Sequence, residues 1–297
     1  MAFNRGMGKL VESLKNEDLF QSKLKKDVER GDVYFTLRPG HGSFYHKGGL
    51  LFYYKNNGFT TYSKYGFLPD IEEQASFTAE ELGRMPSIND FSIGYERIKE
   101  RTKVYFNFFK PENYGLSALY RFSPASKRSD RYFLVDIEVS FGALEEDDPD
   151  SCIDLLLYDN EEQQLLFCEA KLYSNNDLWN NNGEKVLFQL KRYNPLIKAN
   201  TSDIIEQYTV AFEEFNELFN TALKPPISIY DKCGLLIFDY DDYQWKGKLK
   251  PVLEGVRGNY CFHGHPCRPF SDIRSEVVKN LYESLCNYKG VELWMKV

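Results

Sequence analysis

The chain has 297 residues, of which 42% are hydrophobic, 16% aromatic and 27% charged, and its formal net charge is −7. This composition is typical of a globular protein with ample apolar material for a core, and it excludes a disordered chain. No run of about 18 uninterrupted apolar residues occurs, so we expect no membrane span and a cytoplasmic location.

The charge is unevenly distributed along the chain. Residues 1–134 carry 21 Lys and Arg against 16 Asp and Glu, whereas residues 135–297 carry 16 against 28. A basic front and an acidic back are compatible with a protein whose carboxylates hold cations while other parts meet phosphate. The six cysteines have irregular spacings without any Cys-x-x-Cys, so we expect reduced thiols that are mostly packed away.

The first 90 residues predict a helix followed by a small antiparallel meander. The helical pattern covers residues 11–30, and aromatic or β-branched runs separated by Gly, Pro and Asn turns follow at residues 33–37, 43–45, 50–54 and 59–62. Basic side chains are interleaved with these aromatics: Arg38, His41, His46, Lys47, Lys55 and Lys64. The meander is either a nucleic-acid-binding sheet or a half-buried sheet with a solvated basic face. We expect residues 1–90 to be an accessory region and residues 91–297 to hold the core.

The remaining pattern alternates between helices and strands. A helix over residues 88–106 carries opposite charges at helical spacing, which is typical of a solvated face. From Arg131 a strand places Phe133, Val135, Ile137, Val139 and Phe141 on one face and Asp136 and Glu138 on the other. Further elements are expected at residues 153–158 (strand), 165–173 (strand), 184–194 (helix), 202–222 (helix), 233–240 (strand), 271–287 (helix) and 291–297 (strand). The order βββαβ predicts an α/β fold with a mixed sheet flanked by helices.

The strands at residues 153–158 and 165–173 are joined by a polar turn and predict a β-hairpin. If the turn is centred between Glu161 and Glu162, Asp154 lies opposite Glu169, with Cβ atoms about 4.5 to 5.5 Å apart. Lys171 then projects from the same face as Glu169. A register shift of one residue would separate the two carboxylates, so this geometry is conditional on the turn.

Two carboxylates this close in an apolar strand pair repel each other, and a bound divalent cation removes the conflict. Oxygen ligands of this kind suit Mg²⁺ or Mn²⁺. The Lys171 ammonium can then orient a water or neutralise charge on a scissile phosphate. The alternative is that Asp154, Glu169 and Lys171 are ordinary charged residues of an edge hairpin. The apolar residues around them favour a central, covered strand pair and therefore the functional interpretation.

Asp154, fourteen intervening residues and then Glu169-Ala170-Lys171 resemble the signature of the PD-(D/E)XK phosphodiesterase superfamily. The resemblance implies a restriction-endonuclease-like fold, whose core is a helix, three strands, a helix and a further strand. It also implies that Asp154, Glu169 and the backbone carbonyl of Ala170 are metal ligands. Gln189 and Tyr193 resemble the Gln-x-x-x-Tyr motif of the branch that includes RecB-type and lambda-exonuclease-type nucleases, and their spacing puts both on one helix face.

The chain departs from the family pattern in places. The literal Pro149-Asp150 precedes the strand, so Asp154 is the preferred ligand and Asp150 the reserve. A further acidic ligand is common in this branch, and Glu138 is the first choice, with Glu96 or Glu100 on the preceding helix as alternatives. The iron–sulfur cysteines of some relatives are not evident here.

Two other features of the sequence bear on function. Cys261, His263, His265 and Cys267 are four potential zinc ligands, but alternate residues of an extended strand lie about 6.6 Å apart and do not converge on one ion. An ordinary loop is the preferred interpretation of this segment. Trp179, in the Asn-rich loop after Lys171, is expected either to touch substrate or to anchor the loop.

The expected function is that of a metal-dependent nuclease using Mg²⁺ or Mn²⁺ for in-line attack of water on DNA. By resemblance it would leave a 5′-phosphate, and restriction or phage defence is a plausible setting. The alternatives are a non-catalytic nucleic-acid-binding or assembly protein on a nuclease-like fold, and a nuclease acting on RNA. The oligomeric state stays open, a homodimer included.

Overall fold

In the computed structural model the chain forms two compact units. The meander unit consists of Asn4–Arg128 and Val210–Leu223, and the mixed-sheet unit of Met1–Phe3, Ser129–Thr209 and Lys224–Val297. The structure describes residues 3–62, 76–78, 91–123, 125, 131–141, 152–179, 184–230, 232–240, 242–249 and 261–265. The boundary thus falls after Arg128 and not after residue 90.

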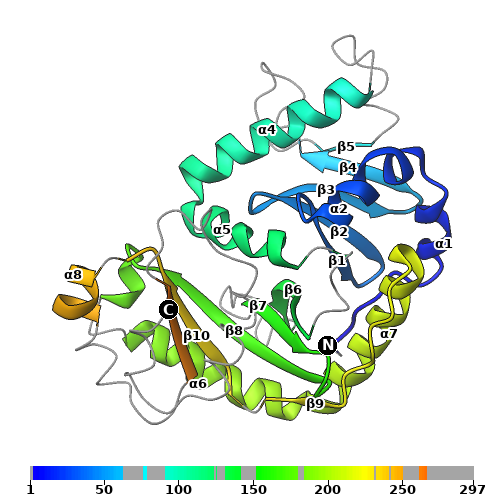
Figure 1. The fold of residues 1–297 in the computed structure, drawn as a ribbon. Helices are drawn as coiled ribbons and strands as arrows, with labels where there is room; N and C mark the ends of the chain where they lie inside the picture. Colours follow the sequence, from blue (N-terminus) through cyan, green and yellow to red (C-terminus); the bar gives the residue numbers. More distant parts are fainter. Residues whose placement is uncertain are drawn as a thin grey trace. The chain divides into compact units, whose positions relative to one another are not determined.

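The meander unit begins with helical turns and continues into a five-stranded antiparallel sheet (Figure 1). The turns are α1 (Leu10–Lys15), the π-helix η1 (Phe20–Leu24) and α2 (Lys25–Arg30). The strands, in spatial order, are β1 (Tyr34–Arg38), β2 (His41–His46), β3 (Gly49–Lys55), β4 (Gly58–Tyr62) and β5 (Ser76–Thr78). The predicted meander is confirmed, and positive φ angles at Lys47, Gly48, Asn56 and Asn57 mark its tight turns.

Aromatic residues of the meander are used in its own packing. Tyr34 stacks on Tyr120 with ring centres 4.8 Å apart, whereas the next residue, Phe35, packs on Phe44 at 4.7 Å and on Phe219 at 5.5 Å. Consecutive strand residues face opposite sides, so both faces of β1 are covered. Arg38 and His46 are 9% and 4% exposed. A solvated basic face is therefore wrong for Arg38 and His46. The buried rings of Tyr34, Phe35 and Phe44 offer no surface on which bases could stack.

Residues after 90 join the meander unit because they pack tightly on it. The helices are α4 (Phe91–Phe109), α5 (Pro111–Leu116) and the 3-10 helix η3 (Ser117–Phe122). The Tyr95 ring stacks parallel to Phe52 at 6.2 Å. A Cβ atom placed on Gly49 would lie 2.3 Å from the Phe106 ring, so only glycine admits this approach of α4.

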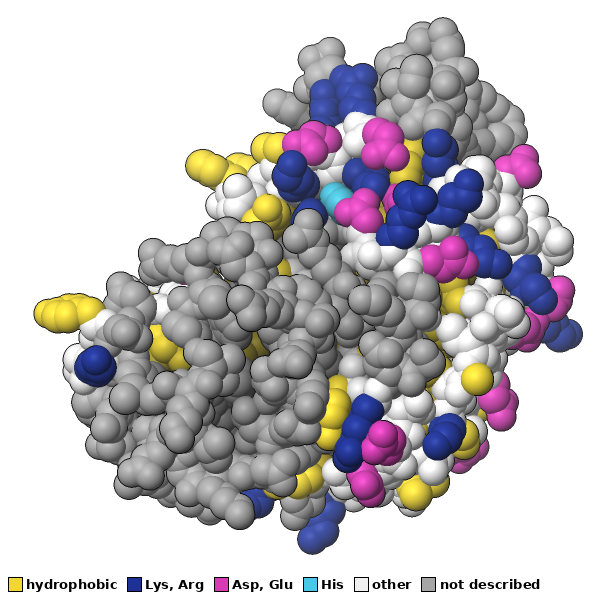
Figure 2. Space-filling model, in the orientation of Figure 1, with side chains coloured by type: hydrophobic (Ala, Val, Ile, Leu, Met, Phe, Trp, Pro, Cys, Tyr) yellow, Lys and Arg dark blue, Asp and Glu magenta, His cyan; other side chains and the backbone are white. Residues whose placement is uncertain are grey.

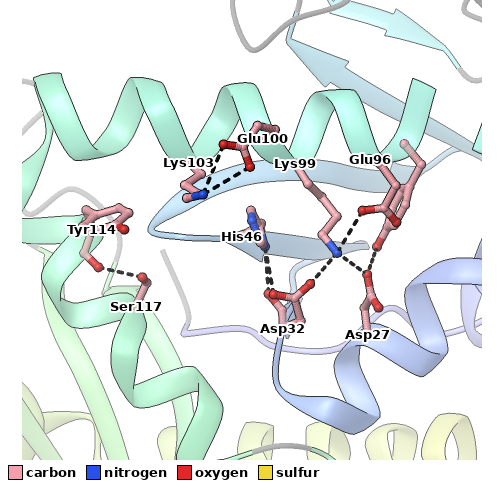
Figure 3. Close-up of polar contacts among 10 residues, drawn as sticks. Asp27, Asp32, His46, Glu96, Lys99, Glu100, Lys103, Tyr114 and Ser117 are labelled. Atoms are coloured by element: carbon pink, nitrogen blue, oxygen red, sulfur yellow. Dashed lines mark hydrogen bonds and ion pairs between the residues drawn. The ribbon is translucent and has the colours of Figure 1, made fainter. Parts of the chain in front are cut away.

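A partly buried ion-pair cluster links α2, the loop after it and α4 (Figure 3). The Lys99 ammonium donates to Asp27 at 2.7 Å and also forms an ion pair with Asp32, and the Tyr95 hydroxyl donates to Asp27 at 2.8 Å. Burial alone would lower the pKa of Lys99, but its bonds to the two carboxylates outweigh burial and raise it. Because Lys99 is only 8% exposed, the predicted solvated face of α4 is wrong at this position.

His46 belongs to the same cluster, with Nδ1 2.9 Å from the carbonyl oxygen of Asp32. Burial lowers the pKa of His46, and this outweighs the opposing effects of the Asp32 charge and carbonyl. The folded unit therefore holds the proton less readily than the unfolded chain, whose histidine pKa is about 6.5. The stabilisation that comes from a neutral His46 is complete above that pH and is lost as the pH falls towards the folded-state pKa.

We accordingly expect the His46 ring to titrate below the ordinary histidine pKa in an NMR pH titration, with its signal assigned by its loss in His46→Gln. Thermal unfolding of the wild type should become easier between neutral and mildly acidic pH, and His46→Gln should reduce that sensitivity. A His46 signal that titrates above the ordinary value would contradict the burial argument.

The mixed-sheet unit is built on strands in the spatial order β11-β10-β8-β7-β6, with β9 beside β8 (Figure 1). The strands are β6 (Tyr132–Ser140), β7 (Cys152–Asp159), β8 (Gln164–Leu172), β9 (Ser228–Ile229), β10 (Gly234–Phe238) and β11 (Cys261–His265). β6, β7 and β8 pair antiparallel, whereas β10 runs parallel to both β8 and β11. The expected mixed α/β sheet is confirmed. The loop expected around Cys261–His265 is wrong, because these residues form a strand.

A β-bulge in β6 changes the predicted facing of its side chains. Leu134 pairs with Leu157, but the next pair is Asp136 with Leu156, which leaves Val135 as the extra residue. Phe133 is therefore on the same face as Asp136, and its ring packs on the opposite residue Tyr158 at 5.3 Å. The expectation that Phe133 shares a face with Ile137 and Val139 is wrong for this reason.

Helices of the mixed-sheet unit are tied to the strands by polar contacts. The helices are the 3-10 helix η5 (Asn176–Leu178), α6 (Glu184–Ala199), α7 (Thr201–Phe219), α8 (Asp242–Gln244) and the π-helix η7 (Trp245–Leu249). The part of α7 after Thr209 belongs to the meander unit. The Asn194 side chain of α6 accepts the N–H of Cys233 at 2.8 Å, and the Tyr208 hydroxyl of α7 donates to Asp136 at 2.6 Å. The predicted helix at 271–287 and strand at 291–297 lie outside the described residues. Among the residues described, none of the helices is both long and apolar enough to cross a membrane.

Candidate active site

The hairpin β7–β8 has the predicted register. Tyr158 pairs with Leu165 and Leu155 with Cys168, so the two strands pair symmetrically about a turn centred between Glu161 and Glu162. The next position of the same register sets Asp154 opposite Glu169. The turn is held by Asp159, whose carboxylate accepts the N–H groups of Glu161 and Glu162 and binds Arg131.

Asp154 contacts the β8 backbone directly. Its Oδ2 accepts the N–H of Ala170 at 2.7 Å, and the side chain keeps partial exposure to solvent. The regular β7–β8 ladder ends at Leu155 and Cys168, so this bond continues the connection one step further through a side chain. This hydrogen bond holds the Asp154 carboxylate beside Ala170, the residue after Glu169.

Glu169 and Lys171 form a buried ion pair. The Lys171 ammonium lies 2.5 Å from Oε1 of Glu169, and the two side chains are 8% and 2% exposed. Charges are removed from water here at a considerable cost, which an ordinary edge hairpin would avoid. The apolar residues Leu155, Leu166, Cys168 and Ala170 are all at most 1% exposed, so the hairpin is central, as expected.

The helix α6 brings the Gln-x-x-x-Tyr residues into the buried interior of the unit. Tyr193 is 1% exposed and its hydroxyl donates to the carbonyl of Cys152, at the start of β7, at 3.0 Å. Burial raises the pKa of Tyr193, and the negative charges of Glu169 and Asp154 raise it further, so this phenol is electrostatically coupled to the carboxylates. Gln189 is 7% exposed, and its Oε1 has no hydrogen-bond partner among the described residues.

The other acidic residues that were expected as an additional metal ligand lie in different environments. Glu138 lies between the pairs Ile137–Leu155 and Val139–Ile153, so the register sets it opposite Asp154, but it is exposed and has a φ of 49°. Glu100 forms an ion pair with Lys103, and Glu96 lies 3.7 Å from Lys99. Asp150 lies outside the described residues.

The donor set fits a hard cation in its chemistry. Asp154 and Glu169 are carboxylates on neighbouring strands, and the carbonyl of Ala170 leaves the extended strand on the same side as the N–H that Asp154 binds. Mg²⁺ commonly uses one or two carboxylates together with waters and phosphate oxygens. No group of three or more His, Cys, Asp or Glu side chains able to hold a metal is found in the part of the chain that the structure describes.

Some contacts of the unit could not be read from the sequence. Tyr208 binds Asp136, and Asn194 binds the N–H of Cys233 just before β10. A tyrosine or an asparagine on a helix has no sequence pattern that predicts such a partner. Trp179 does anchor its loop, because the indole N–H donates to the carbonyl of Tyr173 at 2.7 Å. On the face drawn in Figure 2, the described Lys and Arg side chains are interspersed with Asp and Glu and form no continuous basic field.

Comparison with known proteins adds no relative from which a role could be transferred. No family model, no curated protein and no solved structure matches the chain.

Proposed function

We propose that the protein is a metal-dependent nuclease that hydrolyses phosphodiester bonds of nucleic acid, with DNA as the first candidate substrate. The observation that carries the proposal is the meeting of three charged groups in an apolar hairpin. The Asp154 carboxylate of β7 accepts the N–H of Ala170 at 2.7 Å, and the Lys171 ammonium lies 2.5 Å from Glu169 on β8. A buried charge pair of this kind contributes little to stability compared with apolar residues, so a chemical role is the better explanation.

The order of elements supports the restriction-endonuclease-like core that we propose for the mixed-sheet unit. The antiparallel strands β6, β7 and β8 are followed by α6, and β10 pairs parallel with β8 after the intervening helix α7 and short strand β9. Apart from α7 and β9, which are additional, this agrees with the strand–strand–strand–helix–strand order that the sequence resemblance implies. The candidate residues lie on the second and third of these strands and on the helix after them.

Asp154, Glu169 and the carbonyl of Ala170 would hold Mg²⁺ or Mn²⁺, which would supply a Lewis acid towards a phosphoryl oxygen. The Lys171 ammonium, kept in place by Glu169, carries positive charge for a phosphate that gains negative charge during cleavage. Tyr193 keeps its proton, since its pKa is raised, and positions the start of β7 through Cys152. The open acceptor Oε1 of Gln189 is suited to receive a hydrogen bond from a water at the site.

The test is a cleavage assay of the full chain. Linear, circular and single-stranded DNA and RNA would be incubated with Mg²⁺, Mn²⁺ or EDTA. We expect metal-dependent cleavage that falls on the order of 100-fold or more in Asp154→Asn, which removes a ligand charge. Asparagine retains an oxygen that can accept the Ala170 N–H, so the hairpin should fold. The matched control is Asp203→Asn, an exposed carboxylate on α7.

Cleavage that survives Asp154→Asn would assign the activity to another site or to a contaminant, and preferential cleavage of RNA would correct the substrate. The second candidate function is a nucleic-acid-binding protein without catalysis. The ion pair between Lys171 and Glu169 favours it, because it balances the buried carboxylate without a metal. Tight binding without cleavage of any substrate in either metal would select this candidate.

A further inference from the structure

An aromatic cluster lies at the carboxyl end of β8. The N–H of Tyr173 donates to the carbonyl of Phe238 at 2.9 Å, so the pairing of β8 with β10 continues one residue beyond the end of β8. Side chains alternate along an extended strand, and Tyr173 is therefore on the same face as Glu169 and Lys171. The cluster therefore begins two residues after Lys171, on the same face of the strand.

Trp179 packs against Tyr173 in an edge-to-face arrangement, with ring centres 4.8 Å apart and planes at 64°. Tyr240, which follows β10, adds a third ring, centred 6.4 Å from that of Tyr173. The only hydrogen-bond donor of the indole is already bound to the Tyr173 carbonyl. This hydrogen bond fixes the orientation of Trp179. The side chain is partly exposed, and the part of it that a ligand can contact is the face of its ring.

A cation lies over this ring. The ammonium of Lys248, on η7, is 4.2 Å from the centre of the Trp179 ring, and Lys248 is exposed. Among the described residues, no carboxylate forms an ion pair with Lys248. Because Lys248 is exposed and the ring is only partly buried, this cation is held weakly, and a ligand that stacks on the indole can displace it. The displaced ammonium then remains within reach of an anionic group of the same ligand.

We propose that Trp179 and Lys248 form a subsite for one unpaired nucleotide, with the base stacked on the indole and its phosphate paired with the lysine. A ring with a neighbouring cation has the two features by which proteins bind single-stranded nucleic acid. The inference rests on the proposed function and deepens it, because it names single-stranded nucleic acid or a frayed duplex end as the substrate. A base inside a duplex is stacked on both sides and has no free face for Trp179.

Binding is tested without cleavage, in EDTA, by fluorescence anisotropy of a labelled oligodeoxythymidine, alone and annealed to its complement. We expect tighter binding of the single strand and a loss of about ten-fold in Trp179→Leu. Trp179→Phe keeps an aromatic face but loses the bond to Tyr173, so it should bind within about three-fold of the wild type if stacking matters. Lys248→Gln should reduce the salt dependence of log K by about 0.7, the value for one phosphate contact.

The matched control is Phe188→Leu, because Phe188 is an exposed ring of the same unit with a cation, Arg192, 5.6 Å from its centre. Equal losses in Phe188→Leu and Trp179→Leu, or equal losses in Trp179→Phe and Trp179→Leu, would overturn the subsite. Unchanged binding in Trp179→Leu would do the same. A protein that binds through Trp179 but cleaves no substrate would refute the nuclease and leave the subsite standing. Cleavage that depends on Asp154, with binding that ignores Trp179, would refute the subsite alone.

Discussion

Replacing Lys171 with methionine is expected to reduce nucleic-acid cleavage on the order of 100- to 1,000-fold, the usual loss when a group that stabilises transition-state charge is removed. Methionine preserves most of the apolar volume of the lysine stem. The substitution also leaves the carboxylate of Glu169 buried at 2% exposure without its ammonium partner. Loss of one member of a buried pair costs roughly 3–5 kcal/mol of folding free energy.

The two effects can be separated by measuring stability with and without metal. If a cation binds at Asp154 and Glu169, Mg²⁺ should raise the thermal unfolding midpoint of Lys171→Met more than that of the wild type, because the competing ammonium has gone. The double variant Glu169→Gln/Lys171→Met carries no charge at these two positions and should recover stability without recovering cleavage. Cleavage within three-fold of the wild type by a folded Lys171→Met protein would remove Lys171 from the proposed mechanism.

Replacing Lys99 with methionine is expected to destabilise the meander unit by about 2 kcal/mol. The substitution leaves Asp27 and Asp32 close together without the cation that binds both. The figure is below that of a fully buried pair because the Asp32 side chain is 39% exposed and water screens part of its charge. Hydrogen exchange would report the loss locally, as exchange about 30-fold faster in α2 and α4.

The matched control for Lys99 is Lys103→Met on the same helix. Among the described residues, Lys103 forms an ion pair with Glu100 alone, at 3.1 Å, and its side chain is 41% exposed. Its loss should therefore change stability by about 0.3–0.5 kcal/mol. Adding Asp27→Asn and Asp32→Asn to Lys99→Met should restore part of the protection by removing the repulsion. Equal effects of Lys99→Met and Lys103→Met would show that burial does not strengthen the Lys99 cluster.

Local patterns determined most of the secondary structure. The turn residues Asn56-Asn57 and the aromatic runs around them predict the antiparallel meander, because a two-residue turn with positive φ allows little besides a hairpin. In the β7–β8 hairpin, the polar turn at Glu161 and Glu162 and the apolar strands on either side sufficed to predict the register, whose last pair is Leu155 with Cys168. These features depend on neighbours in the chain, which a sequence lists directly.

The tertiary structure decided which polar residues are buried and with whom. The charge pattern of α4 predicts a solvated face, yet Lys99 is buried because Asp27 and Asp32, far away in the chain, meet it there. The bulge at Val135 likewise reversed the facing of Phe133. Sequence alone determined the local elements and the pairing of one hairpin, whereas burial and long-range partners depend on how segments distant in sequence pack, and no local pattern encodes that packing.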